Sequence, residues 1–381
     1  MSTQDRFLRT MPRDGTGFKR KFNIWQFLHL DPVLLLALVA TALLGLFELY
    51  SASGQHLDMT LKQMMSFSIG LTAMFVMAQV PPRTYQALSP WFYAGGVALL
   101  VAVALFGEVR LGAQRWLDLP GIGSVQPSEF LKLGMPMMLA WYLSGRVLPP
   151  SLPVVGVSLL LICIPWILIA EQPDLGTSLL VMAAGMFVLF LAGLPWWLIG
   201  SFVGLVAATA PVAWNLMHDY QRQRVLTLID PESDPLGTGW NILQSKTAIG
   251  SGGLFGKGWL HGTQSHLEFL PEGHTDFIIA AYSEEFGLAG VIVLLLLYLV
   301  IIGRGIYIAS TAQDSYSRLL AGAITLAFFV YVFVNMGMVS GILPVVGVPL
   351  PFVSYGGTAI ITLMSGFGIL MSIQTHKKLI G

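Results

Sequence analysis

Ten apolar runs, each long enough to cross a lipid bilayer, recur along the 381 residues of this chain. A bilayer core of about 30 Å requires about 20 apolar residues per helix, and runs of about 17 to 25 suffice. The sequence therefore predicts an all-α polytopic membrane protein. The ten expected transmembrane helices lie at roughly 31–52, 61–80, 90–107, 127–145, 152–170, 177–194, 196–217, 287–308, 318–342 and 354–375.

The composition excludes several other classes of protein. Charged residues make up 10% of the chain, against about 25% in soluble globular proteins. The 20 basic and 20 acidic residues leave no positive excess for nucleic-acid phosphates, so we expect no nucleic-acid partner. The single cysteine, Cys163, cannot build an internal disulfide framework or a cysteine-ligated zinc site.

Charge also orients the expected helices. The first 30 residues carry a cluster of arginine and lysine and lack the short apolar core and cleavage site of a signal peptide. By the positive-inside rule this basic segment, 1–30, is cytoplasmic. A single ten-span domain then covers 31–376, and an even number of spans makes 377–381 cytoplasmic too. The loops at 108–126 and 218–275 are expected on the extracytoplasmic side.

The loop at 218–275 carries aromatic residues and turn signals, which favour an ordered lid. After it, one apolar stretch runs from Asp276 to about residue 309. As a single helix it would be about 51 Å long, which exceeds the bilayer core. Gly287, directly after the Glu284–Phe286 segment, predicts a break between a short helix at about 276–286 and the eighth span.

Glu129 and Lys132 stand in the outer part of the fourth span, three residues apart and hence on one helix face. A charge at mid-bilayer costs about 2.5–3.5 kcal/mol even on the mildest scale, so such residues need an explanation. The pair is either a structural ion pair or an anion site in which Glu129 orients Lys132 towards an outward-open cavity.

Two aspartates also allow two interpretations. Asp276 opens a helix after the long loop, where it either caps the helix or acts as a general base reached from outside. Asp174 either caps the sixth span, as expected, or helps to shape a site. The outer loops also carry basic residues that could form a positive rim suited to phosphate. These residues are Arg110, Arg115, Arg222, Arg224, Lys246 and Lys257.

Five motifs resemble those of the SEDS family (shape, elongation, division and sporulation proteins). They are AQRWLDL at 113–119, QPSEFLK at 126–132, EQPDLGTS at 171–178, LEFLPEGHTDFI at 267–278 and NMGMVSGILPVVGVPLPFVSYGGTA at 335–359. The resemblance covers about residues 25 to 378, and the RodA branch is more similar than the FtsW branch.

This resemblance implies a ten-span peptidoglycan glycosyltransferase that polymerises lipid II during cell elongation, on the outer face of the membrane. It implies a class B penicillin-binding protein and other elongation-complex proteins as partners, besides lipid II and membrane lipid. Asp276 falls on the proposed catalytic base of the family, Glu129 and Lys132 on the charged pair of its QPSE-x-x-K motif, and Arg115 on its QRW arginine.

The residues fit an inverting single displacement that releases undecaprenyl pyrophosphate. Such a step needs one base for the acceptor proton and cations for the departing pyrophosphate. We expect Asp276 to be that base, with Lys132 and Arg115, together with Arg110 or Lys246, as the cations. No ligand cluster in the sequence demands a metal, although a divalent cation such as Mg²⁺ or Mn²⁺ could assist. The alternatives are a lipid II flippase and a non-catalytic scaffold for the penicillin-binding protein.

Overall fold

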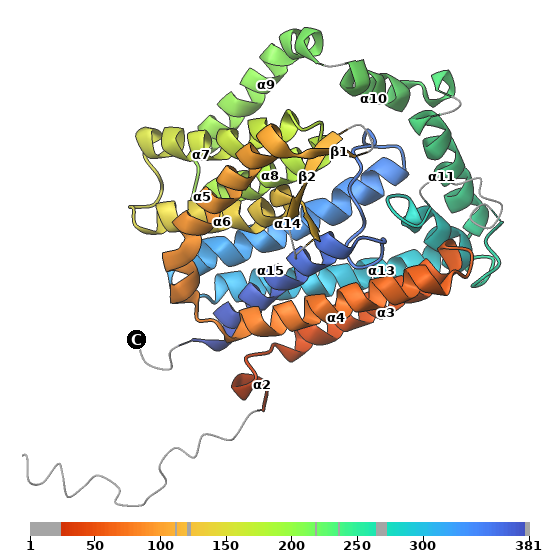
Figure 1. The fold of residues 1–381 in the computed structure, drawn as a ribbon, viewed down its shortest axis with the longest axis horizontal. Coiled ribbons are helices and arrows are strands. Elements are labelled where there is room, and N and C mark those ends of the chain that lie inside the picture. The colour runs from red at the N-terminus through yellow and green to blue at the C-terminus, as the bar shows by residue number, and fades with distance from the viewer. Residues whose placement is uncertain are drawn as a thin grey trace, which may run out of the picture.

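The computed structural model describes residues 24–110, 113–119, 123–217, 219–234, 237–263 and 273–377. Long helices dominate these ranges (Figure 1). The helices of the first half are α2 (Ile24–Phe27), α3 (Pro32–Ala52), α4 (Leu57–Gln79), α5 (Pro82–Phe106), α6 (Pro127–Ser144), α7 (Leu152–Ala170), α8 (Leu175–Leu191) and α9 (Trp196–Leu216). Those of the second half are α10 (Asp219–Ile229), η1 (Pro231–Ser233), α11 (Thr238–Gly252), α13 (Ile278–Ser310), α14 (Ser315–Val339) and α15 (Gly357–Thr375).

A long helix lies at each of the ten predicted spans, with shifted bounds. α4 begins at Leu57 and α5 at Pro82, several residues before the predicted starts, because each helix includes a polar first turn that the apolar run leaves out. Within the described residues, seven helices are long and apolar enough to cross a membrane: α3, α4, α5, α7, α13, α14 and α15. α8 and the first part of α9 are apolar but shorter.

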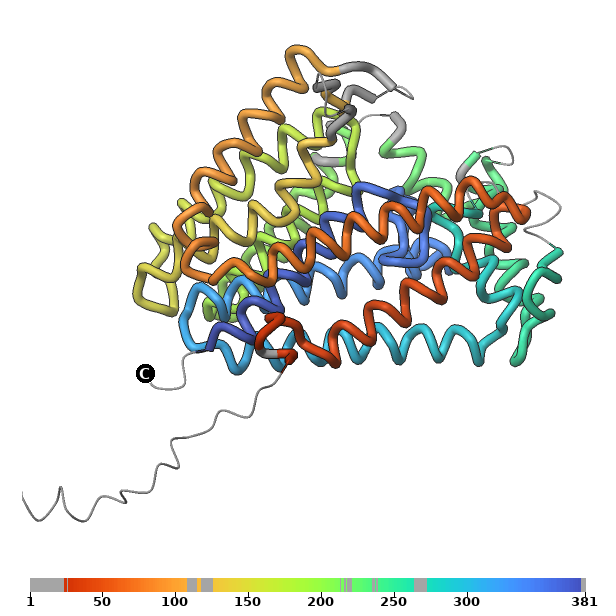
Figure 2. The backbone as a smooth tube through the Cα atoms, turned by 60° about the horizontal axis from the view of Figure 1, so that its bottom comes forward, coloured from red at the N-terminus to blue at the C-terminus, as the bar shows by residue number. Residues whose placement is uncertain are grey.

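Successive long helices alternate in direction, which gives the bundle two ends. We call them the Asp276 end, where α13 begins, and the Asp31 end, where α3 begins. α4 packs along α15, and α3 packs along α13. In Figure 2 α3 is red, α4 orange, α13 cyan and α15 dark blue. α9 stands apart at the edge of the bundle in Figure 1, and its side chains are largely exposed, Trp196 at 78%.

A small sheet replaces part of the loop predicted at 108–126. It consists of β1 (Glu108–Arg110), β2 (Ala113–Leu119) and β3 (Gly123–Val125), paired antiparallel in that order. Arg110 pairs with Ala113 and Leu117 with Val125. Two of the strands have three residues, which is too short for the alternating pattern that identifies a strand in a sequence.

The segment between α14 and α15, residues 340–356, is non-helical, and its second half, 348–354, is largely buried. Phe352 in this segment is 1% exposed and packs against Phe328 and Phe367, with ring centroids 6.0 and 5.8 Å away. The Tyr298 hydroxyl donates to the Pro351 carbonyl at 2.7 Å, and Gln63 Nε2 to the Ser354 carbonyl at 2.9 Å. Irregular backbone at membrane depth needs such partners within the protein.

The predicted break in α13 is confirmed at Gly287, whose φ of 64° and ψ of −165° are not helical. The break leaves helix carbonyls and amides without partners in their own helix. Residues 253–258 supply those partners. Lys257 N and Gly258 N donate to the carbonyls of Glu284 and Glu285, both at 3.0 Å, and the amides of Leu288 and Ala289 donate to the Gly253 and Leu254 carbonyls, also at 3.0 Å.

At the Asp31 end, Asp31 joins α3 to α13. Its Oδ1 accepts the Leu34 amide as the N-cap of α3 at 3.0 Å, and its Oδ2 accepts Arg304 Nη2 at 2.6 Å and Nε at 3.1 Å. Asp31 is 2% exposed. The charge therefore serves as both a helix cap and an interhelical ion pair.

We expect Asp31→Asn to destabilise the protein by about 1.5–3 kcal/mol, the usual worth of hydrogen bonds to charged groups. Thermal unfolding of the purified protein in detergent measures this loss. Asp31→Asn combined with Arg304→Gln should cost less than the sum of the two single variants, because the two side chains share one interaction. If the losses of unfolding free energy in the two single variants add up in the double variant, Asp31 and Arg304 do not interact as described.

Candidate functional site

The backbone around Asp276 is clamped by residues that follow it by 59 positions or more. Asn335 Nδ2 donates to the Asp276 carbonyl at 2.8 Å and to the Val348 carbonyl at 2.7 Å. The Ser354 hydroxyl donates to the Thr275 carbonyl at 2.6 Å. The N-cap position of α13 is Phe277, so Asp276 precedes the capping position itself.

The Asp276 carboxyl lies against Gly347 in the 340–356 segment. A Cβ at Gly347 would stand 3.4 Å from Asp276 Oδ2, and Gly347 has a φ of +73°, which side chains rarely adopt. α8 lies close to the same segment at Gly176. A Cβ atom added to Gly176 would lie 2.7 Å from the Val346 carbonyl oxygen, so a side chain there would clash. Asp276 is half-buried at this junction of α8, α13 and the 340–356 segment.

The start of α8 is tied to the start of α6. Asp174 is the N-cap of α8, as predicted, and its Oδ1 accepts the Thr177 amide at 3.3 Å. Gln126 Nε2 donates to Asp174 Oδ2 at 3.0 Å. The Arg115 guanidinium from β2 donates to the Gln172 carbonyl at 3.3 Å and to the Pro173 carbonyl, and it lies 4.0 Å from Asp174. Arg115 thus holds the turn between α7 and α8.

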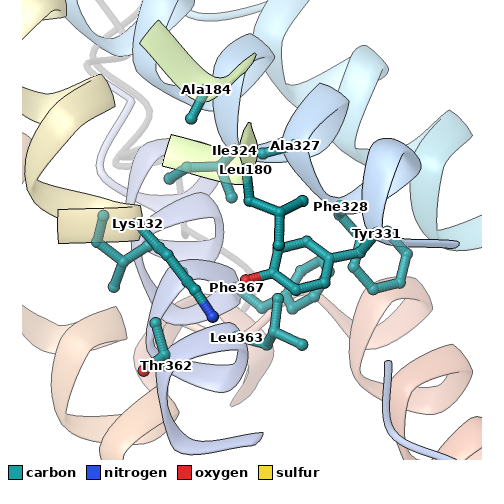
Figure 3. A pocket seen from close by; sticks show the side chains of 12 residues that line it. Lys132, Leu180, Ala184, Ile324, Ala327, Phe328, Tyr331, Thr362, Leu363 and Phe367 are labelled. Atoms are coloured by element: carbon teal, nitrogen blue, oxygen red, sulfur yellow. The ribbon is translucent and has the colours of Figure 1, made fainter. Parts of the chain in front are cut away.

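Glu129 and Lys132 form the predicted ion pair on α6, with side chains only 10% and 11% exposed. Lys132 Nζ lies 5.2 Å from the centroid of the Tyr331 ring on α14. Figure 3 shows these two polar tips pointing towards one another inside a small pocket of about 30 Å³. The pocket is otherwise mainly apolar and is lined by α6, α8, α14 and α15.

A second pocket of about 360 Å³ lies beside the first and shares Leu133 and Thr362 with it. Glu129 lines this second pocket, whereas Lys132 lines the first. Apolar side chains of α4, α5, α6 and α15 make up most of its wall, including Met77, Phe92 and Phe130. The ion pair therefore stands between two adjoining, mostly apolar pockets.

The other predicted cations lie apart from this pair. Lys246 on α11 is exposed, and its side chain passes close over Gly341. A Cβ atom added to Gly341 would lie 2.7 Å from Lys246 Nζ. Lys257 is bound to Glu284 at 2.5 Å. The side chain of Arg110 lies outside the described residues. In the part of the chain that the structure describes, no three side chains among His, Cys, Asp and Glu are placed to hold a metal ion.

Sequence reasoning did not identify Asn335 as the residue that holds Asp276. Asn335 is fully buried and bridges two carbonyls, and its only sequence signal is a polar amide within an apolar span.

We expect Asn335→Ala to destabilise the protein by about 1–3 kcal/mol, because buried carbonyls lose their donor. Thermal unfolding tests this, with Thr209→Ala as control, since the Thr209 hydroxyl bonds only within its own helix. Equal unfolding midpoints of Asn335→Ala and Thr209→Ala would refute this role of Asn335.

Residues 26–379 match the family model FtsW/RodA/SpoVE, described as cell cycle protein. The chain is 58% identical over 366 residues to peptidoglycan glycosyltransferase MrdB of Escherichia coli (strain K12), covering 96% of this chain and 99% of the relative.

Two solved structures have the same fold. One comes from work on the structural coordination of polymerization and crosslinking by a peptidoglycan synthase complex; its matching chain has a TM-score of 0.79 and 30% identity, covering 91% of this chain and 99% of that one. The other is the crystal structure of the rod shape determining protein RodA of Thermus thermophilus, with a TM-score of 0.69 and 27% identity, covering 91% and 98%.

Proposed function

This chain belongs to the FtsW, RodA and SpoVE family, and we propose that it is a multi-pass inner-membrane peptidoglycan glycosyltransferase that polymerises lipid II. The observation that carries this proposal is the 58% identity to a relative of that activity over nearly the whole of both chains. The arrangement of charges at the Asp276 end supports it independently.

In the proposed reaction, the acceptor sugar hydroxyl attacks the anomeric carbon of the donor sugar. A new glycosidic bond forms, the bond from that carbon to the pyrophosphate oxygen breaks, and the acceptor proton passes to a base. Asp276 is the proposed base, because its backbone is clamped by Asn335 and Ser354 while its carboxyl stays partly exposed. Such fixed positioning of a general base contributes to catalysis.

The departing pyrophosphate needs positive charge where negative charge develops. Lys132 is the proposed principal cation, since it points into a pocket of low polarity where its charge acts strongly. Lys246 is exposed beside the 340–356 segment and is proposed as a further contact. Arg115 supports this end mainly through the α7–α8 turn, and a divalent cation such as Mg²⁺ would add charge at the leaving group.

The proposed topology has ten spans and two cytoplasmic termini, with the Asp276 end facing the extracytoplasmic side. His29 and His376 support the placement of both termini on one side, because their rings stack with centroids 4.0 Å apart. The proposed partner is a class B penicillin-binding protein, whose transpeptidase would crosslink the strands made by this chain. The similar structure from a synthase that couples polymerization and crosslinking supports that partner.

The test is polymerisation of labelled lipid II by the purified protein together with its penicillin-binding partner, with glycan strands resolved on a gel. The partner should carry an inactivated transpeptidase, so that uncrosslinked strands remain visible. Strands are the expected product. An intact complex that makes none, while the protein alone scrambles lipid II across liposomes, would favour a flippase. An intact complex with neither activity would favour a scaffold.

A further inference from the structure

Three carboxyl groups gather beside the break in α13, away from the proposed site. Glu284 and Glu285 directly precede the break, and Glu48 lies near the end of α3. Their exposed fractions are 0%, 1% and 0%. α3 packs along α13, and Ser51, one helical turn from Glu48, contacts Glu285, so the three carboxyl groups lie at one contact between these helices. Three buried carboxylates so close together require compensation.

Glu284 has that compensation. Its Oε1 accepts Lys257 Nζ at 2.5 Å, the Thr263 amide at 2.9 Å and the Thr263 hydroxyl at 2.8 Å. These donors come from the segment that also pairs with the backbone at the break. A carboxylate with an ammonium partner and further donors is stable in its ionised form. Glu284 is therefore the charged member that holds residues 257–263 to α13.

Glu285 faces α3 instead. Its Oε1 accepts a hydrogen bond from the Ser51 hydroxyl, which lies one helical turn from Glu48. Tyr282, a further titratable side chain near Glu48, donates its hydroxyl to the Gly290 carbonyl at 3.0 Å. The cluster thus joins α3 to the segment of α13 between Asp276 and the break.

Glu48 differs from its neighbours. Neither of its carboxyl oxygens has a hydrogen-bond partner among the described residues, although the side chain is completely buried. Lys257, the lysine that contacts this cluster, is already bound to Glu284. Within the described residues, no metal-binding group of three side chains exists here either. An ionised Glu48 would be a buried charge without a counter-ion among these residues.

We propose that Glu48 is a proton-binding site, which stays neutral in the folded protein while Glu284 remains paired with Lys257. Loss of the proton to water would leave an uncompensated negative charge between α3 and α13. That charge would weaken the attachment of α3 to the break, and with it the support of the segment that begins at Asp276. A carboxyl that binds its proton only when folded makes stability fall as the pH rises.

The experiment compares wild type with Glu48→Gln and Glu284→Gln as full-length proteins in detergent, by thermal unfolding between about pH 6 and pH 9. Glutamine copies a neutral carboxylic acid in shape. Glu48→Gln should keep or raise the wild-type midpoint and reduce its fall with rising pH. Glu284→Gln, the matched control, should lower the midpoint at every pH because it removes the partner of Lys257. An equal drop in both variants would overturn the proposal.

Infrared spectroscopy provides a second measurement that does not depend on stability. At neutral pH, wild type should show the carbonyl band of a buried neutral carboxylic acid, and Glu48→Gln should lack it. Absence of the band from wild type, or its persistence in the variant, would refute a protonated Glu48. A wild-type midpoint that rises when sodium or magnesium chloride replaces choline chloride, with no rise in Glu48→Gln, would assign the site to a metal cation instead.

Discussion

Asp276→Asn should reduce the rate of lipid II polymerisation by about 10²–10⁴-fold, the usual contribution of a positioned general acid or base. Asparagine keeps the size of the side chain but cannot accept the proton of the acceptor hydroxyl. The measurement is the initial rate of strand formation by the complex with the penicillin-binding protein, at equal protein levels. The backbone clamp from Asn335 and Ser354 does not involve the carboxyl, so we expect the fold to persist.

Asp58→Asn is the matched control for this variant. Asp58 is an exposed carboxyl in the first turn of α4, at the same end of the bundle, and it lies outside the proposed site. Its polymerisation rate should equal that of wild type. Wild-type polymerisation by Asp276→Asn would exclude this residue as the base, and an equal loss in both variants would point to a general effect on the membrane surface.

Lys132→Met should have the largest effect on stability, because it leaves Glu129 as a buried charge without its partner. Breaking one side of a buried ion pair costs about 3–5 kcal/mol. The double variant with Glu129→Gln and Lys132→Met buries no charge and should recover most of this loss in thermal unfolding. Polymerisation should remain strongly reduced in the double variant, since the cation for the pyrophosphate is still missing.

The double variant separates the two interpretations of the pair. A protein that is stable but inactive assigns Lys132 to the reaction, as proposed. A protein that is stable and fully active would make the pair structural, and the proposed pyrophosphate contact would then be wrong. Lys132→Arg provides a further comparison, because it keeps the charge while placing a larger, planar group against Tyr331.

Much of the architecture follows from local sequence signals. Apolar length located the long helices, and Gly287 after two glutamates located the break in α13, because both signals lie within a few consecutive residues. The spacing of Glu129 and Lys132 predicted a shared helix face, and the structure pairs them. Asp174 before an apolar run predicted an N-cap, which the structure also confirms. The family resemblance is confirmed by the matching family model.

Contacts between distant segments could not be predicted in this way. Asn335 reaches Asp276 across 59 residues, and Ser354 reaches Thr275 across 79, and no periodic pattern encodes either pairing. The role of Arg115 in the α7–α8 turn was missed for the same reason, since the sequence gives its charge and not its partner. The charge of Lys257 was likewise visible, whereas its binding to Glu284 depends on how the 253–263 segment folds back.

The break in α13 also fixes the rotational phase of Asp276. Residues 253–258 anchor the backbone at Gly287 and Asn335 holds the Asp276 carbonyl, so the register of the helix between these two points is fixed. Each α-helical residue turns the chain by about 100° and advances it by about 1.5 Å. One residue added between Ile278 and Phe286 would therefore swing Asp276 away from Gly347 without changing any side chain. The number of residues in this short helix, and not only their identity, determines which way the carboxyl faces.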